Sequence, residues 1–230
     1  MRHVAEATWL FFDVGEVLMD ERPTNRAWAE AVRRVLAEDG LAVSVEQALQ
    51  AQRAAAAGGY SDPKNGAVAL LAGDDETLFR RVRAHGWPLL DEPFADAVSA
   101  LEWLKEAGYR LGLIANQRKA ESRARLGWSG LLEHFEVVLL SGDVGLSKPD
   151  PAIFQLALQM AECAPGEAVM VGDRPDNDIA PARQVGMGTV RILRGLHRDY
   201  SPRSAAEEAD VTVDSLGALT ELLRAGRHLR

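Results

Sequence analysis

The chain has 230 residues, of which 47% are hydrophobic and 26% are charged, and its formal net charge is −8. This size and composition fit one large domain, or one domain that carries a modest second one. The negative charge argues against nonspecific binding to nucleic acid or to an anionic membrane surface. The single cysteine, Cys163, excludes an internal disulfide and argues against a cysteine-based metal site.

The apolar run near the amino terminus, WLFF, is too short for a signal peptide. No segment approaches the ~18 apolar residues that a bilayer span requires. We therefore expect a soluble, cytoplasmic protein with neither a nucleic-acid nor a membrane partner.

The first predicted element is a buried strand over residues 9–12, where WLFF runs directly into Asp13. Residues 24–92 differ, because they are rich in alanine and have helical periodicity. Within them, Ser44 and Gln47 have the spacing of a capping box. The stretch AAAAGGYSDPKNG combines glycines, a proline and an Asn-Gly pair, which predicts a loop between two of these helices.

After Pro93, predicted helices and strands alternate. Helices are predicted over residues 94–108, 118–127, 151–162 and 177–186, and strands over residues 109–116, 135–142, 168–173 and 188–193. A last strand over residues 209–213 precedes a terminal helix that begins near residue 215. Apolar strands that alternate with amphipathic helices predict an α/β fold, with a parallel sheet covered on both faces.

The helical segment after the first strand is too long for one crossover connection, at roughly 70 residues. We therefore predict two domains: an α/β core of residues 1–20 and 93–230, and a small helical domain of residues 21–92. In open parallel sheets, ligands bind outside the carboxyl ends of the strands. An insert that leaves from this edge would cover the binding crevice.

Four polar residues fall at or just after the predicted strand ends: Asp13, Asn116, Lys148 and Asp173. Asp13 and Asp173 would meet there although they are 160 positions apart. Two adjacent carboxylates repel each other, and a bound cation relieves this repulsion. Oxygen ligands suit Mg²⁺, which usually completes its shell with waters and a substrate phosphate. Together with Lys148, a carboxylate nucleophile and a cation suit attack on an anionic substrate.

Four segments, in this order, resemble the motifs of the haloacid dehalogenase superfamily: FFDVGEVL, LGLIAN, SKPDPAIF and VGDRPDNDIAPARQVGM. The resemblance extends from residue 9 to about residue 190, and the last two motifs are the most specific. It implies a Rossmann-like core with a helical cap inserted after the first motif, which matches the insert described above.

The resemblance also implies roles for individual residues. Asp13 would be the nucleophile that forms a covalent intermediate, and Lys148 would balance charge on the nucleophile and the substrate. Asp173 would hold Mg²⁺, and Asp178 would support either Lys148 or, through water, the ion. The backbone carbonyl of Gly15 would be a further ion ligand.

Two positions depart from the pattern of the family's phosphatases. Gly15 stands where most of them have a second aspartate, which serves as general acid and then as general base. Ala115 stands where a serine or threonine normally contacts the phosphoryl group, and Asn116 follows it as in many relatives. A missing general acid typically costs about 10²–10⁴-fold in rate, which favours substrates with a good leaving group. Glu16 is a candidate replacement, although a solvent-facing or turn position is the simpler interpretation.

Several of these residues also have simpler structural interpretations. Asp13 could cap the turn that follows it, and Lys148 before a proline is by itself an ordinary loop lysine. Asp173, Asp176 and Asp178 could cap the next helix, and we expect Asp176 to do only that.

The helical insert offers candidate substrate contacts, which are Arg22, Arg26, Arg53, Tyr60, Lys64 and Asn65. Residues 60–66 are the best of these, because they interrupt the helices and loops often determine specificity.

Three functions stay open. The preferred one is a Mg²⁺-dependent phosphatase, a monomer or a homodimer, that acts on a small soluble phosphate monoester. In it, Asp13 forms an aspartyl phosphate that water hydrolyses. The second is a 2-haloacid dehalogenase, in which Asp13 displaces halide from carbon without a metal. The third is a regulatory module that binds an ion or phosphate without turnover.

Overall fold

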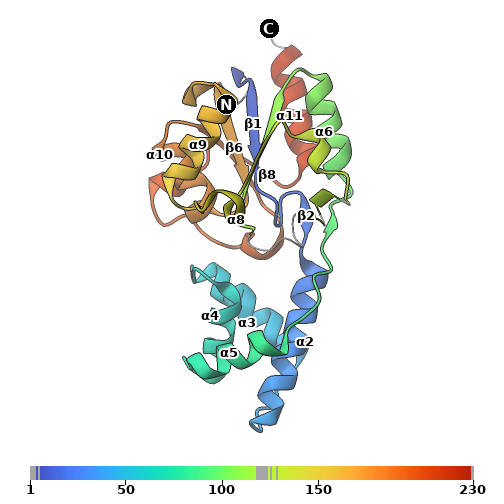
Figure 1. The fold of residues 1–230 in the computed structure, drawn as a ribbon, viewed down its shortest axis with the longest axis vertical. Coiled ribbons are helices and arrows are strands. Elements are labelled where there is room, and N and C mark those ends of the chain that lie inside the picture. Colours follow the sequence, from blue (N-terminus) through green and yellow to red (C-terminus); the bar gives the residue numbers. More distant parts are fainter. Residues whose placement is uncertain (1–3, 5, 118–123, 125, 128, 229–230) are drawn as a thin grey trace. The chain divides into compact units, whose positions relative to one another are not determined.

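The computed structural model describes residues 4, 6–117, 124, 126–127 and 129–228. The chain divides into two compact units, which Figure 1 draws as ribbons. The first holds Met1–Met19, Pro93–Arg194 and Pro202–Arg230, and the second holds Asp20–Glu92 and Gly195–Ser201. Residues 195–201, which the sequence pattern grouped with the sheet, thus fall in the helical unit.

A six-stranded parallel sheet forms the centre of the first unit, and this confirms the predicted fold class. Its spatial order is β5-β4-β1-β6-β7-β8. The strands are β1 (Trp9–Phe12), β4 (Arg110–Ala115), β5 (Val137–Leu140), β6 (Ala168–Gly172), β7 (Gly188–Ile192) and β8 (Val211–Val213). Two further short strands, β2 (Met19–Asp20) and β3 (Glu92–Pro93), form a separate two-stranded sheet.

Helices cover both faces of the six-stranded sheet (Figure 1). On one face lie α6 (Ala97–Glu106) and α11 (Leu216–His228), and on the other lie α9 (Pro151–Ala161) and α10 (Ala180–Gln184). The central strand supplies both hydrophobic cores by alternation: Leu10 and Phe12 point to the first face, and Trp9 and Phe11 to the second. Because this strand is buried on both sides, every one of its residues is apolar, as the sequence WLFF indicated.

Short irregular helices connect these elements. They are η1 (Leu132–His134), η2 (Pro165–Glu167), η5 (Ala205–Glu207) and the four-residue helix α8 (Ser141–Val144). The predicted helix over residues 177–186 begins instead with a π-helical turn, η3 (Pro175–Ile179), and only then becomes α10. The predicted helix over residues 118–127 lies mostly outside the described residues.

The second unit is helical. It contains α2 (Arg22–Glu38), α3 (Val45–Ala57), α4 (Pro63–Ala72), α5 (Glu76–His85) and the short turn η4 (Gly195–His197). The predicted capping box at the start of α3 is confirmed: the Gln47 N–H donates to Ser44 Oγ at 3.1 Å, and the Ser44 N–H donates to Gln47 Oε1 at 2.8 Å. In the part of the chain that the structure describes, no helix is long and apolar enough to cross a bilayer.

The predicted loop over residues 60–66 is shorter than expected. Asp62 caps α4, because its Oδ1 accepts hydrogen bonds from the N–H groups of Lys64 and Asn65. The second half of the expected loop is therefore the first turn of a helix. The ring of Tyr60 packs on Gly66, where an added Cβ would lie 2.5 Å from the ring.

Candidate active site

Asp13 lies at the carboxyl end of β1, in the middle of the sheet. Its N–H donates to the Val171 carbonyl on β6 at 2.9 Å. The connections change direction here, because β1 leads to β4 on one side and β6 leads to β7 on the other. Such a switch point opens a crevice outside the strand ends. Asp13 and the end of β6 therefore stand where an open parallel sheet binds its ligands.

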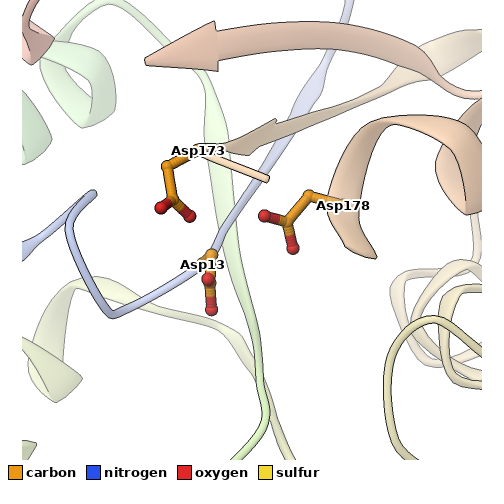
Figure 2. Close-up of side chains that lie close together, drawn as sticks. All are labelled: Asp13, Asp173 and Asp178. Atoms are coloured by element: carbon orange, nitrogen blue, oxygen red, sulfur yellow. The ribbon is translucent and has the colours of Figure 1, made fainter. Parts of the chain in front are cut away.

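Three carboxyl groups gather at this point. Oxygen atoms of Asp13, Asp173 and Asp178 lie within 4.8 Å of one another. Figure 2 shows the carboxyl groups of Asp173, which follows β6, and Asp178, which projects from η3, directed toward the space around Asp13. The side chain of Asp13 is 13% exposed, whereas Asp173 is 3% and Asp178 is 0% exposed. The predicted meeting of Asp13 and Asp173 is present, and Asp178 joins them.

Gly172 allows Asp178 to approach the end of β6. A Cβ atom at position 172 would lie 2.4 Å from the Cβ of Asp178 and 2.6 Å from one of its carboxylate oxygens. The Asp178 N–H donates to the Arg174 carbonyl, and Asp178 Oδ2 accepts from the Arg174 N–H at 3.0 Å. The turn η3 and the missing side chain at Gly172 thus fix Asp178 against the strand.

Lys148 is buried between two of these carboxylates. Its Nζ lies 2.7 Å from Asp13 Oδ1 and 2.6 Å from Asp178 Oδ1, and its side chain is 0% exposed. A buried ammonium is stable only when charges and hydrogen bonds compensate its lost hydration. Lys148 is therefore not the ordinary solvated loop lysine of the simpler interpretation.

Burial and charge change the acidity of both partners. Burial raises the pKa of Asp13 to about 7; the charge of Lys148 opposes this rise, and the charges of Asp178 and Asp173 add to it. Burial alone would lower the pKa of Lys148, but the negative charges of Asp13 and Asp178 outweigh it and raise that pKa above its usual value. The ammonium group of Lys148 therefore stays charged. The remaining negative charge of the three carboxylates favours binding of a further cation.

Asn116 and Ala115 lie at the end of β4. The side chain of Asn116 forms hydrogen bonds, whereas that of Ala115 packs in the core. The Asn116 side chain donates from Nδ2 to the Lys148 carbonyl at 2.8 Å and accepts the Lys148 N–H on Oδ1 at 2.9 Å. The methyl group of Ala115 is 0% exposed and packs in the hydrophobic core under α6 and α11. Any contact of Ala115 with a substrate would therefore come from its backbone.

The turn after β1 holds Gly15 and Glu16. Gly15 forms an isolated bridge with Met19, and the Glu16 N–H donates to the Met19 carbonyl at 2.8 Å. Glu16 has a φ of 56°, in the left-handed region that few residues other than glycine adopt. It is a turn residue, as one of the two simpler interpretations expected, and because it is only 3% exposed it does not face the solvent.

Two arginines near Asp173 were not singled out from the sequence. Arg191 Nε, on β7, donates to the Asp173 carbonyl at 3.4 Å, and Arg191 is buried. Arg174 forms two hydrogen bonds with Asp176, at 3.2 and 2.8 Å. Asp176 is thus an ion-pair partner of Arg174 and stays outside the carboxylate cluster. The sequence could have indicated Arg191 only through its position, because a charged residue is unusual within the mostly apolar strand GTVRI.

The candidate substrate contacts of the helical unit are surface residues for the most part. Arg22 pairs with Asp20, and Arg26 pairs with Glu46 at 3.1 Å. Tyr60 is 44% exposed, and Arg53 is also exposed. Lys64 and Asn65 lie in the first turn of α4.

The cluster has the chemistry of a site for a hard divalent cation. Its donors are carboxylate oxygens from Asp13, Asp173 and Asp178, close enough together to share one ion. The repulsion among three buried acids would be relieved by a cation, since Lys148 supplies only one positive charge. The residues that are present therefore fit a metal ion of this class.

The parallel sheet thus brings one lysine and three carboxylates together at a Rossmann-like switch point. The family model for haloacid dehalogenase-like hydrolases matches residues 8–186, and the chain belongs to this family, which confirms the resemblance of the four motifs.

Two curated proteins that resemble the chain are phosphatases. The chain is 32% identical over 232 aligned positions to the phosphoserine phosphatase of Thermus thermophilus, covering 86% of this chain and 93% of that one. It is 34% identical over 167 positions to the glyceraldehyde 3-phosphate phosphatase of Methanopyrus kandleri, covering 73% and 67%. Among solved structures, a haloacid dehalogenase-type phosphatase from Thermococcus onnurineus aligns with a TM-score of 0.60 and 26% identity, over 94% of this chain and 97% of that one.

Proposed function

We propose that this chain is a Mg²⁺-dependent phosphatase that hydrolyses a small, soluble phosphate monoester in the cytoplasm. The observation that carries the proposal is the arrangement of Lys148 between Asp13 and Asp178, with Asp173 beside them at the sheet switch point. The phosphatase names of the similar proteins support the same reaction class.

The proposed metal ligands are the carboxylates of Asp13 and Asp173, with Asp178 nearby and the Gly15 carbonyl as a backbone ligand. Three oxygen donors on rigid elements suit Mg²⁺ better than a softer metal. Bound Mg²⁺ would supply positive charge that stabilises the oxygens of the transferring phosphoryl group.

Asp13 is the proposed nucleophile. One of its carboxylate oxygens attacks phosphorus and forms an acyl phosphate, while the bond between phosphorus and the ester oxygen breaks. Lys148, at 2.7 Å from Asp13 Oδ1, favours the ionised carboxylate that this attack requires. Water then attacks the acyl phosphate, releases inorganic phosphate and restores Asp13.

The leaving oxygen needs a proton, and Gly15 cannot supply one. We therefore propose that the enzyme prefers esters whose leaving group is stable as an anion, or that water provides the proton. In such esters, the loss of about 10²–10⁴-fold that follows from a missing general acid is smallest.

The helical insert, residues 21–92, is proposed to be a cap that selects the substrate. The backbone groups of Ala115 and Asn116, at the end of β4, remain proposed parts of the phosphate site. The chain is expected to be a monomer or a homodimer, which light scattering during size-exclusion chromatography would determine.

The test is release of inorganic phosphate from a panel of small phosphate esters, with Mg²⁺ and after chelation. Asp13→Asn should abolish turnover, whereas Asp176→Asn, which changes an acid of η3 outside the cluster, should retain most of it. The panel should include one ester with an activated leaving group.

Two outcomes would contradict the proposal. Release of halide from 2-chloro acids without metal, in place of phosphate release, would identify a dehalogenase. Binding of Mg²⁺ or phosphate with no turnover of any ester would identify a regulatory module.

A further inference from the structure

The side chain of Asn116 is committed to the backbone of Lys148. Its Nδ2 donates to the Lys148 carbonyl at 2.8 Å, and its Oδ1 accepts the Lys148 N–H at 2.9 Å. One amide thus binds both polar groups of a single backbone residue 32 positions away. A side chain that is engaged by both its donor and its acceptor is poorly placed to reach for a substrate as well.

The backbone of Lys148 lies outside every helix and strand, so its polar groups need hydrogen-bond partners from elsewhere. It lies between α8, which ends at Val144, and α9, which begins at Pro151, and so it belongs to no helix or strand. Among the described residues, its backbone polar groups pair with the Asn116 side chain and not with a regular sheet or helix: the Lys148 carbonyl accepts from Asn116, and the Lys148 N–H donates to it. The rigid strand β4 therefore fixes a residue of a connecting segment.

The ammonium group of Lys148 requires accurate placement. Its Nζ must reach Asp13 at 2.7 Å and Asp178 at 2.6 Å simultaneously. One carboxylate directly follows β1 and the other belongs to η3, so both come from segments far from Lys148 in the sequence. A shift of the lysine backbone by about 1 Å would break at least one of the two ion pairs, and displacements of this size can cost about 10²-fold in rate.

We propose that Asn116 is a positioning residue that holds the Lys148 ammonium against Asp13, and that it acts on the reaction through Lys148 and not through contact with the substrate. This inference rests on the proposed phosphatase function for its kinetic consequence, but the placement of Lys148 can be measured without turnover.

The first experiment measures the exposure of Lys148 directly. The protein is treated with an amine-acetylating reagent for increasing times, and acetylation at each lysine is quantified by mass spectrometry. In the unchanged protein Lys148 should be protected, because its side chain is 0% exposed. Lys105, which is exposed, serves as the internal standard.

Asn116→Ala removes both hydrogen bonds and should raise the acetylation rate of Lys148 by at least about 10-fold relative to Lys105. Asn116→Asp should give a smaller rise, because its carboxylate can still accept the Lys148 N–H but cannot donate to the carbonyl. Gln117→Ala is the matched control, since the hydrogen bonds of the neighbouring glutamine with the described residues are made by its backbone. It should leave Lys148 protected.

The second experiment separates positioning from substrate contact. With an ester that the unchanged enzyme hydrolyses, Asn116→Ala should lower kcat by about 10²-fold and change KM little. A rise in KM at constant kcat, with Lys148 still protected in both variants, would overturn the inference. If the unchanged protein hydrolyses no ester, the acetylation experiment still decides the placement of Lys148, and only the proposed function fails. Asn116→Asp keeps the size of the side chain and provides the test if Asn116→Ala does not fold.

Discussion

Lys148 illustrates how a buried charge depends on its partners. Replacing it by methionine keeps most of the volume but leaves Asp13 and Asp178 facing each other without a cation. We expect Lys148→Met to lower the free energy of unfolding by about 3–5 kcal/mol near pH 7, in the absence of metal, and to abolish turnover. The measurement is urea unfolding, with Lys105→Met as the exposed control. The deficit should shrink as the pH falls and one carboxyl becomes protonated, and a deficit that is equal at all pH values would contradict this explanation.

The raised pKa of Asp13 links the pH to metal binding. Because the folded pKa is about 7 and the ordinary value is 3.8, the folded chain retains a proton that the unfolded chain releases. Without metal, this stabilisation is complete below pH 3.8 and is lost as the pH rises through 7.

A divalent cation competes with that proton. The increase in melting temperature caused by Mg²⁺ should therefore be larger at pH 8 than at pH 6. Thermal unfolding with and without Mg²⁺ measures this difference. In Asp13→Asn the increase should be smaller and nearly independent of pH across this range; the same pH dependence in that variant would assign the proton to another group.

The close approach of Asp178 to Gly172 predicts that a larger residue at position 172 would distort the carboxylate cluster. An alanine there would place its Cβ 2.4 Å from the Cβ of Asp178, so the turn η3 would have to move. We expect Gly172→Ala to lower stability by about 1–3 kcal/mol and to weaken Mg²⁺ binding, measured by calorimetry. Gly166→Ala, where no atom lies within 4 Å of the added Cβ, should change neither quantity appreciably.

At the scale of elements, strands were easier to predict than the segments between them. Each strand of the six-stranded sheet is mostly apolar and is bounded by turn residues, so periodicity and composition located all of them. The start of the helix after β6 was misplaced because Pro175 and the contacts of Asp178 favour a π-helical turn, which has no sequence signature of its own. Residues 63–66 were assigned to a loop because they contain proline and glycine, although proline is also favourable in the first turn of a helix.

The capping box at Ser44 tests whether local sequence signals stabilise the helical unit. Ser44→Ala removes the acceptor of the Gln47 N–H and should cost about 1 kcal/mol of unfolding free energy. Gln50→Ala, at an exposed position of the same helix, should be near neutral. Denaturant titration of both variants provides the comparison; equal effects would mean that the cap contributes little to α3.

At the scale of the whole molecule, the sequence predicted where the site lies but did not predict most of the contacts within it. The strand ends placed Asp13, Asn116, Lys148 and Asp173 at one edge, and the structure has all of them there. The reciprocal hydrogen bonds of Asn116, the engagement of Arg191 with Asp173 and the burial of Glu16 were not predictable, because each depends on side-chain directions between elements that are far apart in sequence.

The division into two units suggests that the helical insert, residues 21–92, can be deleted to test its role. The ends of the insert are neighbours, because β2 and β3 pair with each other, so a short glycine-serine linker can replace residues 21–92. The shortened chain should keep Mg²⁺-dependent thermal stabilisation, because all the cluster residues lie in the first unit. It should also hydrolyse a different range of esters, measured on the same panel. An unchanged range would contradict the proposal that the insert selects the substrate.

The central position of β1 also has a consequence for biosynthesis. Trp9–Phe12 leave the ribosome before both of their partner strands, β4 and β6, and the second of these ends at Gly172. At usual elongation rates, this apolar tetrapeptide waits about 10–30 s for its last neighbour. During that interval β1 is an unpaired apolar segment that can associate with other chains. Pairing between strands that are far apart in the sequence is slow. Nascent chains should therefore depend on chaperones until β6 has been made.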